Sequence, residues 1–410
     1  MRVTAVIVAC ALVPAGARAA GGAGDTPAPV ASGAEAPVIG GHDATAGKWP
    51  DVAAILFPGS GGEAAKCTGV LIAPTVVMTA GHCYDPSGTL LPDNVLIGAT
   101  SLDRPEDGET IAIQRGIVFP DAESTEDVAV LVLARASTRP PRRLATGWAR
   151  PEIADGAPVA LVGFGAVNAS GDLYVRRLQE GTTTITDFDC SRSSGCNAGA
   201  QPDGELGAGG MGVDTCPGDS GGPLYLMTQG GPFLAGVTSR GYADAQLPCS
   251  EGGIYERPDK IVAWVEATAG TAVAHGPEPT ADPITAVHGA GGDTTIRVND
   301  PRSDSHRFEI TTPPAHGTAR VRSDGAVRVC TDPAATPGPD AVTVTITDTG
   351  HAGRALAITI AVQIEDGTAP PTCDIDAFDD DGGCCDSGRS SGPAVPLTIV
   401  MLALVRRRRR

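Results

Sequence analysis

Short apolar stretches separated by glycine, proline and aspartate run through residues 38–256 of this 410-residue chain. Brief alternation of apolar and polar positions between turn-forming residues is typical of β-strands. Asp127 opens a continuous apolar run, Val128–Leu133, that predicts a buried strand. The pattern therefore predicts an all-β domain.

A helix and a second set of strands follow. In Pro258–Ala267 the apolar residues Ile261, Trp264 and Val265 recur at helical spacing and predict a short helix. Residues 286–367 are predicted to form a β-sandwich, because about six or seven strands fit a segment of this length. The clearest strands are Thr294–Val298, Phe308–Thr311, Thr318–Arg322, Ala326–Thr331, Val342–Thr347 and Ala355–Ile364, with a turn at Ser323–Gly325.

The amino-terminal end has the composition of segments that are cleaved off during export and maturation. Arg2, the apolar stretch after it and Ala17-Arg18-Ala19 predict a secretory signal peptide over residues 1–19. A lipoprotein signal ending at Cys10 is the alternative. Residues 20–37 are rich in Gly, Ala and Pro and are predicted to form a short propeptide.

The carboxyl-terminal end is acidic, then apolar, then basic. Residues 271–285 and the acidic, cysteine-containing residues 368–392 are predicted linkers, since 374–381 lacks the spacing and closing Glu of a calcium loop. Residues 393–410 combine an apolar run with an arginine cluster. As a helix, Pro393–Val405 would span about 20 Å, against about 30 Å for a bilayer core. A permanent membrane span is therefore not favoured; a single-pass anchor and a nucleic-acid-binding tail are the alternatives.

Charge and cysteine content indicate an exported protein. The chain has 30 basic and 48 acidic residues, a net charge of −18. Such a surface repels nucleic acid, so no nucleic-acid partner is expected. Eleven cysteines suit an oxidising compartment. We therefore expect the protein to be extracellular or held at the cell surface.

One eight-residue segment carries a candidate nucleophile. In Cys216-Pro217-Gly218-Asp219-Ser220-Gly221-Gly222-Pro223, the serine lies in a glycine-rich turn that leaves its hydroxyl uncrowded. A serine needs an imidazole to take its proton and a carboxylate to hold that imidazole. His42 and His82 are the only histidines between residues 38 and 270.

Three motifs in the order His, Asp, Ser resemble those of the chymotrypsin- and trypsin-like serine endopeptidases. They are Thr79-Ala80-Gly81-His82-Cys83, the run that begins at Asp127, and the Ser220 segment. The resemblance covers about residues 38–270 and implies two packed six-stranded β-barrels, a short C-terminal helix and a cleft holding the triad. It implies Ser220 as nucleophile, His82 as base, Asp127 as orienting acid, and the N–H groups of Gly218 and Ser220 as oxyanion hole. The alternative is that His82 is an ordinary core histidine and Asp127 an ordinary turn residue.

The same resemblance implies three disulfide bonds. They are Cys67–Cys83, Cys190–Cys196 and Cys216–Cys249, and Cys330 with Cys373 is a further candidate pair. Metal binding is the alternative for the cysteines, but no CxxC pair accompanies clustered histidines. No metal ion and no cofactor is therefore expected.

The resemblance also implies a substrate pocket. Asp214 would form its floor, and Ser239, Gly241 and Gly253 its walls, with the glycines leaving room for a long side chain. A buried carboxylate favours a cationic partner, which predicts cleavage of polypeptides after Arg or Lys. A solvated loop aspartate is the alternative. Arg240 departs from the aromatic residue usual at its position, and its charge could repel a basic substrate or fold toward Asp214.

Activation is implied by Val38-Ile39-Gly40-Gly41, which resembles the new amino terminus of activated relatives. Its freed ammonium would pair with Asp219. Because the bond to be cut follows Pro37, a separate activating protease is expected. A plain Gly-Gly turn without processing is the alternative.

Two weaker resemblances concern the rest of the chain. Residues around 312–318 and 340–348 resemble bacterial cadherin-like or Ig-like domains, which suggests a spacer or adhesion role. The order of Cys, Gly-Arg, apolar run and Arg cluster resembles a myxobacterial C-terminal sorting tag. It implies processing machinery at the membrane and retention through Cys384 or Cys385.

These features together predict a secreted or surface-anchored serine endopeptidase. The alternative is a catalytically inactive homologue that serves as a binding or adhesion module. An esterase would share the chemistry, but the chain lacks the α/β-hydrolase elbow context.

Overall fold

The computed structural model describes most of the region between residues 37 and 378. The described ranges are 37–59, 64–86, 91–122, 124–200, 203–303, 305–351, 353–368 and 373–378. The predicted signal peptide, the propeptide up to residue 36, Cys384, Cys385, and the apolar and arginine-rich segments lie outside them. No helix within these ranges is long and apolar enough to cross a membrane.

The first part of the fold is a closed antiparallel barrel. Within the described residues its strands close in the order β2-β3-β4-β7-β6-β5. Their bounds are Val52–Phe57 (β2), Ala64–Ala73 (β3), Val76–Ala80 (β4), Asn94–Ile97 (β5), Glu109–Val118 (β6) and Val128–Leu133 (β7).

These strands are apolar because both of their faces are buried. In β7, Leu131 and Leu133 belong to the cluster inside the first barrel. Val128 and Val130, on the opposite face, belong to a cluster that includes Val162 and other residues of the second barrel. A strand buried on two sides does not need polar alternation, which explains the continuous apolar run after Asp127.

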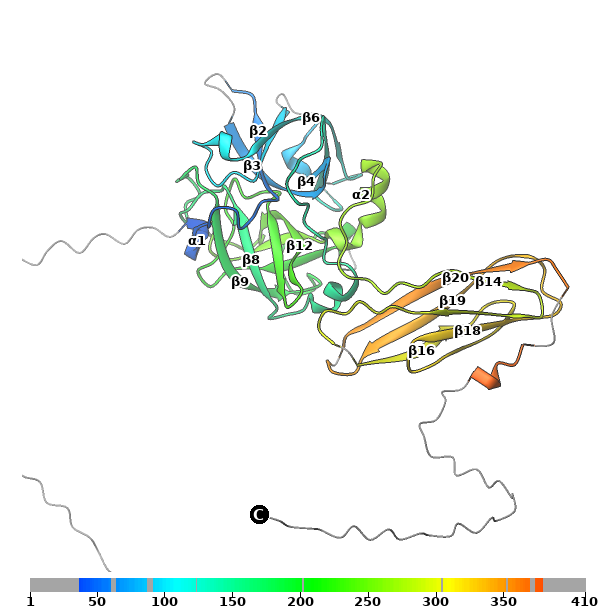
Figure 1. The fold of residues 1–410 in the computed structure, drawn as a ribbon. Helices are drawn as coiled ribbons and strands as arrows, with labels where there is room; N and C mark the ends of the chain where they lie inside the picture. Colours follow the sequence, from blue (N-terminus) through cyan, green and yellow to red (C-terminus); the bar gives the residue numbers. More distant parts are fainter. Residues whose placement is uncertain are drawn as a thin grey trace, which may run out of the picture.

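The second barrel has the same construction. The strands are ordered β9-β10-β13-β12-β11-β8, and β8 also pairs with β9, which closes the barrel, with β1 as an additional edge strand. Their bounds are His42–Asp43 (β1), Pro158–Gly163 (β8), Gln179–Asp187 (β9), Glu205–Ala208 (β10), Pro223–Thr228 (β11), Gly231–Gly241 (β12) and Gly253–Glu256 (β13). Figure 1 shows the two barrels stacked on each other. The predicted fold class of two six-stranded barrels is confirmed.

Helices are few and short in the described part of the chain. The α-helices are Pro37–Gly40 (α1) and Val262–Ala269 (α2), and the 3₁₀ turns are Gly81–Cys83 (η1), Pro105–Asp107 (η2), Gly147–Glu152 (η3), Ala198–Ala200 (η4), Pro258–Lys260 (η5) and Asp376–Phe378 (η6). In α2 the side chain of Val265 is buried, and Trp264 packs edge-on against Phe119 with ring centroids 4.7 Å apart.

Two further sheets form a sandwich beyond the barrels. The larger has the order β14-β20-β19-β16 and the smaller β15-β18-β17, and only β14 and β20 run parallel within the described residues. The bounds are Ile284–Val287 (β14), Gly291–Thr295 (β15), His306–Thr312 (β16), Gly317–Val321 (β17), Ala326–Thr331 (β18), Gly338–Asp348 (β19) and Ala355–Glu365 (β20). β18 coincides with its predicted range, whereas β14 was not predicted.

The segment predicted as a linker lies along the barrels. The backbone N–H of Ala274 donates to the carbonyl of Ile72 at 2.9 Å, and the N–H of Leu144 donates to the carbonyl of Ala274 at 2.8 Å. Val273 is buried in the cluster between the barrels. The chain is therefore fixed to the barrels until just before the sandwich begins.

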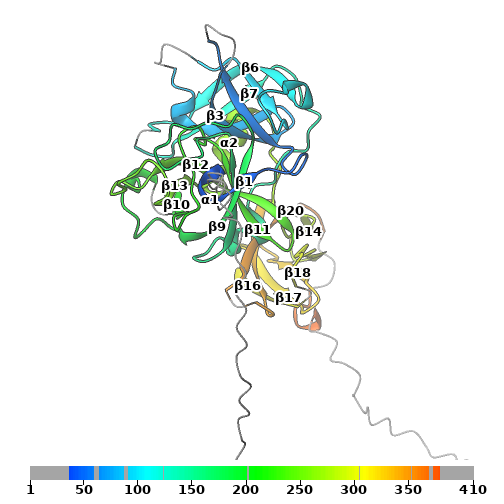
Figure 2. The same cartoon turned by 90° about the vertical axis from the view of Figure 1, so that its left-hand side faces the viewer.

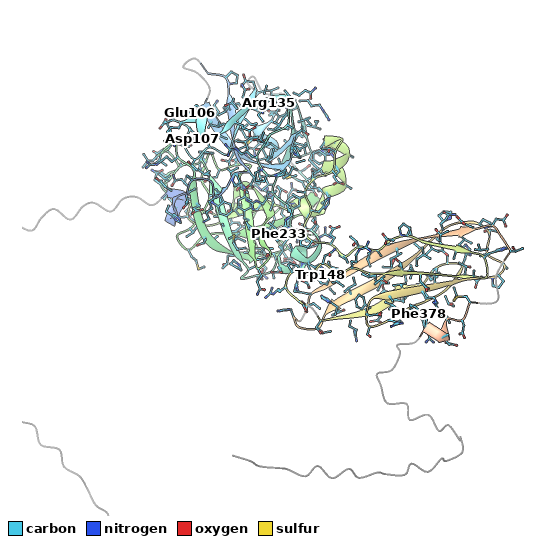
Figure 3. All side chains as sticks on the ribbon, viewed as in Figure 1. Glu106, Asp107, Arg135, Trp148, Phe233 and Phe378 are labelled. Atoms are coloured by element: carbon cyan, nitrogen blue, oxygen red, sulfur yellow. A yellow bond between two sulfur atoms is a disulfide. The ribbon has the colours of Figure 1, made fainter. Side chains whose placement is uncertain are left out.

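Trp148 joins the two units. It belongs to η3 of the barrel region, yet its buried ring is part of the apolar core of the sandwich, and Figure 3 shows it where the two units meet. Its Nε1–H donates to the carbonyl of Val298 at 2.9 Å. The buried guanidinium of Arg354 donates to the carbonyl of Trp148 at 3.2 Å and pairs with Asp300 at 3.0 Å. Figure 2 shows the ribbon of the two units turned by 90° about the vertical axis.

The far side of the sandwich holds the last described segment. Cys373 is bonded to Cys330 of β18. Phe378 is buried under Arg328, whose guanidinium carbon lies 4.6 Å from the ring centroid. The last described segment is therefore held against the smaller sheet of the sandwich.

The junction yields a first prediction. Replacing Trp148 by Ala removes a large buried side chain, which typically costs about 3–5 kcal/mol of unfolding free energy. In the full-length chain the sandwich should then unfold at lower urea concentration than the barrels, and X-ray scattering should report a wider spread of shapes. Trp264→Ala, away from the junction, should lower stability without widening that spread. Unchanged scattering from the Trp148 variant would contradict the role assigned to this ring.

Candidate active site

Strand register brings His82 and Asp127 together. η1, which contains His82, follows β4 directly, and Asp127 directly precedes β7. These strands are antiparallel neighbours in which Ala80 faces Val128. Residues that follow one strand and precede its antiparallel partner share one end of the sheet. The His82 Nδ1 atom lies 2.7 Å from Asp127 Oδ2, and the backbone N–H of His82 donates to Asp127 Oδ1 at 2.9 Å.

A third donor completes the surroundings of the Asp127 carboxylate. The hydroxyl of Ser239, on β12 of the second barrel, donates to Asp127 Oδ2 at 2.7 Å. Burial alone would raise the pKa of Asp127, but the hydrogen bonds from His82 and Ser239 and the charge of His82 bring it below its ordinary value. The carboxylate is therefore held ionised beside an imidazole that is about half exposed.

The turn that contains Ser220 belongs to the second barrel but is held by the first. The hydroxyl of Thr68, on β3, donates to the carbonyl of Gly218 at 2.9 Å. The backbone N–H of Thr68 donates to the carbonyl of Ser220 at 2.9 Å. Thr68 follows Cys67, whose disulfide partner Cys83 follows His82. The turn that contains Ser220 and the segment that contains His82 are therefore both attached to adjacent residues of β3, Thr68 and Cys67.

Two backbone N–H groups of this turn lack an acceptor in the described part of the chain. Asp219 N–H donates to Cys216 at 2.9 Å, and Gly221 N–H donates to Thr238 at 2.7 Å. The N–H groups of Gly218 and Ser220 donate to no described atom. Gly218 has φ +100°, and a Cβ there would approach the Gly165 backbone to 2.9 Å, so only glycine fits. The N–H groups of Gly218 and Ser220, on either side of Asp219, are therefore suited to bind a developing negative charge.

Asp219 is a buried carboxyl without a cationic partner among the described residues. It accepts hydrogen bonds from the backbone N–H groups of Gly165 at 2.8 Å and Cys216 at 2.9 Å. Burial, with a smaller contribution from the charge of Asp214, raises the pKa of Asp219 to about 7. Val38 is buried in the apolar cluster inside the second barrel, and the following residue, Ile39, forms a β-bridge with Asp214.

A cavity of about 230 Å³ adjoins Ser220. It brings together the predicted pocket residues, which are Asp214, Ser239, Gly241 and Gly253. Asp214 is 2% exposed, and its Oδ2 accepts from the backbone N–H groups of Ser250 at 2.8 Å and Gly252 at 2.9 Å. Burial raises its pKa. Within the described residues no Arg, Lys or His forms an ion pair with Asp214.

Arg240 lines this cavity but points away from Asp214. Its guanidinium pairs with Glu205 at 2.6 Å and Glu256 at 3.4 Å. The expectation that Arg240 could fold toward Asp214 is therefore wrong, because two buried carboxylates on β10 and β13 attract it instead.

A wider groove of about 880 Å³ extends from the other side of the same residues. Ser239 and Arg240 line both cavities, so the groove and the pocket are adjacent. His82 and Asp127 line the groove together with Phe119 and the loop around Cys196. An extended peptide could therefore lie in the groove with one side chain in the pocket.

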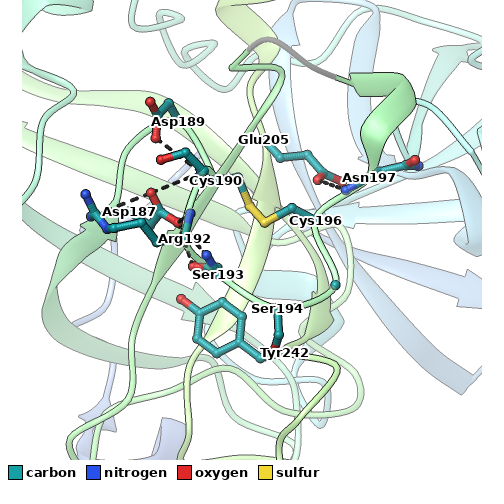
Figure 4. The surroundings of a disulfide bond; sticks show 12 residues. Asp187, Asp189, Cys190, Arg192, Ser193, Ser194, Cys196, Asn197, Glu205 and Tyr242 are labelled. Atoms are coloured by element: carbon teal, nitrogen blue, oxygen red, sulfur yellow. Dashed lines mark hydrogen bonds and ion pairs between the residues drawn. A yellow bond between two sulfur atoms is a disulfide. The ribbon is translucent and has the colours of Figure 1, made fainter.

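The three implied disulfide pairs are present in the structure. Cys67 is bonded to Cys83, Cys190 to Cys196, and Cys216 to Cys249; Figure 4 shows the surroundings of Cys190–Cys196. Two described groups have donor atoms within metal-binding distance, Cys67/His82/Cys83 and Cys190/Cys196/Glu205. Their sulfurs are in disulfides and cannot act as thiolate ligands.

Similarity to known proteins decides the family. The family model Trypsin matches residues 38–265. The chain belongs to the trypsin family. It is similar to human chymotrypsin-like elastase family member 1, with 30% identity over 56% of this chain and 90% of the relative. The dog elastase is 31% identical over 56% of this chain and 90% of its own length. A solved structure of mouse neuropsin, a serine protease, is similar with TM-score 0.45 and 25% identity, covering 56% of this chain and 98% of its own.

The family assignment fixes the general chemistry of this protease. It is a serine endopeptidase, and polypeptides are its substrates. Sequence reasoning missed Thr68 and the Ser239 hydrogen bond to Asp127, because each depends on strands far apart in the chain that pack only after folding.

The burial of Asp219 predicts a pH-dependent stability. Its folded-state pKa, about 7, lies above the unfolded value near 4. The folded chain therefore binds the proton more tightly, and the free energy of unfolding should fall as pH rises from about 4 to about 7. In a Ser220→Ala background, which prevents self-cleavage, Asp219→Asn should make this fall in unfolding free energy smaller by up to about 4 kcal/mol between about pH 4 and pH 7.

Urea unfolding between pH 4 and pH 8 measures this slope. Asp172→Asn is the control, because Asp172 is fully exposed and its pKa is lowered by hydrogen bonds from Asn168 and Ser170. Equal slopes in the parent and the Asp219 variant would show that Asp219 carries no such penalty.

Proposed function

We propose that this protease cleaves polypeptides after Arg or Lys, with Ser220, His82 and Asp127 as its catalytic triad. The observation that carries the proposal is the 230 Å³ cavity lined by both Ser220 and the buried carboxylate of Asp214, which pairs with no cation among the described residues. The hydrogen bonds that His82 donates to Asp127 support the triad.

The proposed reaction follows from these contacts. Ser220 Oγ attacks the scissile carbonyl carbon while His82 Nε2 takes its proton, and the unused N–H groups of Gly218 and Ser220 bind the oxyanion. His82 then gives the proton to the leaving amine. Water attacks the acyl-enzyme by the same route and releases the second product. Asp127 keeps the Nδ1 proton of His82 in place and stabilises the imidazolium form.

The charge balance of the pocket supports a basic side chain in the substrate. Backbone N–H groups partly compensate Asp214, but burial raises its pKa, and no cation among the described residues pairs with it. A substrate guanidinium or ammonium would supply it. Arg240 does not oppose this, since its own charge is paired with Glu205. The walls contain Gly241 and Gly253, which leave space for a long side chain.

A second candidate is cleavage after small apolar residues. The named relatives in human and dog are elastases, and the sequence of this chain is about equally similar to both. A buried, unpaired carboxylate would make such a residue a poor occupant of the pocket. The first candidate is therefore preferred.

We also propose activation by cleavage after Pro37, performed by a separate protease. The new ammonium of Val38 would pair with Asp219, remove the cost of burying that carboxyl without a cation, and order the pocket. The burial of Val38 in the second barrel and the bridge between Ile39 and Asp214 support this proposal.

The proposed location is outside the cell or at its surface. The predicted signal peptide, the four disulfides among the described residues and the acidic net charge support export. Retention through Cys384 or Cys385 after removal of the arginine-rich tail by membrane-associated machinery remains a proposal from the sequence alone, as does the cadherin-like or Ig-like character of the sandwich.

Peptide-library profiling of the chain trimmed to begin at Val38 tests the specificity. Asp214→Ser should lower kcat/KM for Arg and Lys substrates by about 10²- to 10³-fold, because the buried charge pair with the substrate is lost. Cleavage after apolar residues should change far less. Asp244→Ser, an exposed acid on the neighbouring loop, is the matched control. A parent enzyme that prefers Ala or Val would favour the elastase-like candidate instead.

A further inference from the structure

Two buried carboxylates face each other behind the active site. Glu205 on β10 and Glu256 on β13 are direct register partners, and both side chains are 0% exposed. Like charges directly opposite each other on neighbouring strands are unfavourable, and burial increases their cost. Such a pair requires a cation or a proton.

Arg240 supplies the cation, and all three nitrogens of its guanidinium donate hydrogen bonds. Its Nη2 lies 2.6 Å from Glu205 Oε1 and donates to the carbonyl of Gly195 at 2.9 Å. Its Nη1 donates to Ser239 Oγ at 3.0 Å and Glu256 Oε1 at 3.4 Å, and its Nε donates to Gly195 at 3.3 Å. The guanidinium is therefore turned inward, with each of its three nitrogens engaged by the protein.

The contact with Ser239 connects this cluster to the triad. An arginine can only donate, so the Ser239 oxygen accepts from Arg240 and its own proton is left for another partner. That partner is Asp127 Oδ2, at 2.7 Å. Arg240 thereby fixes the direction in which Ser239 donates, and Asp127 in turn holds His82.

The cluster also holds a wall of the substrate groove. Glu205 Oε2 accepts from the backbone N–H of Asn197 at 2.6 Å, a contact visible in Figure 4. Gly195 and Asn197 belong to the loop of the Cys190–Cys196 disulfide, which lines the wider groove. One ion cluster therefore joins this loop to the carboxylate of the triad.

We propose that Arg240 is a positioning residue of the triad: it neutralises the buried Glu205–Glu256 pair and directs the Ser239 hydroxyl onto Asp127. It thereby sets the charge behind Asp127 and the proton affinity of His82. The inference rests on the proposed roles of His82 and Asp127. It does not depend on which residue the pocket prefers.

The surrounding charges determine the expected signs. Burial, and next the charge of Glu205, raise the pKa of Glu256 to about 9, so at neutral pH the cluster pairs Glu205 with Arg240. Glu126 interacts with Glu205 from the loop that precedes β7, and Asp85 and Asp121 line the groove beside His82. Loss of Arg240 makes this environment more negative and favours imidazolium, whereas loss of the Glu205 charge makes it more positive.

Opposite shifts of the His82 pKa test the proposal. Arg240→Met should move the acid limb of kcat/KM to higher pH, and Glu205→Gln to lower pH, each by about half to one pH unit. Arg240→Lys should largely retain the parent profile, because it keeps the charge. Arg192→Met is the matched control, since Arg192 lies on the same disulfide loop but pairs with Asp155.

Two measurements keep this test independent of folding yield and of the proposed function. Active-site titration with a phosphonylating reagent normalises the rates to folded enzyme. In Ser220→Ala chains, NMR titration of the His82 ring gives the same pKa without turnover. Shifts of opposite sign support the proposal; no shift, or shifts of the same sign, overturn it. An inactive parent whose His82 shifts as expected would overturn the proposed function and leave this inference intact.

Discussion

The buried carboxylate of Asp127 is the group on which the arrangement of the site depends. It lies where the end of β4 meets the start of β7, and it is held ionised by donors from both barrels. Its charge can persist there only while His82 and Ser239 donate to it. Ser239 in turn accepts a hydrogen bond from Arg240, so the stabilisation of the Asp127 carboxylate depends on residues of the second barrel.

The division of the site between two barrels explains how the rest of the fold contributes. The first barrel provides the histidine and its acid, and the second provides the nucleophile turn and the pocket. Thr68 crosses this boundary with two hydrogen bonds to the nucleophile turn. The sandwich is fixed to the second barrel through the ring of Trp148, so it extends from the protease in a set direction.

The sequence alone was informative about residues that lie in short local motifs. The roles of His82, Asp127 and Ser220 were inferred because each lies in a local motif, and they stay a prediction. The barrels could be predicted because their strands are short and apolar. The roles of Thr68 and Glu205 could not be predicted. A threonine or glutamate within a strand carries no local signal, and its partner is set by strand register and barrel packing, which appear only in three dimensions.

The central claim is that the His82 imidazole, oriented by Asp127, activates the Ser220 hydroxyl. The most direct measurement is labelling by a fluorophosphonate of the chain trimmed to Val38, with the modified residue located by mass spectrometry. We predict modification at Ser220, strongly slowed when His82 is replaced by Ala and slowed as well by Asp127→Asn. A parent chain that stays unlabelled, or that is labelled equally fast without His82, would contradict the account.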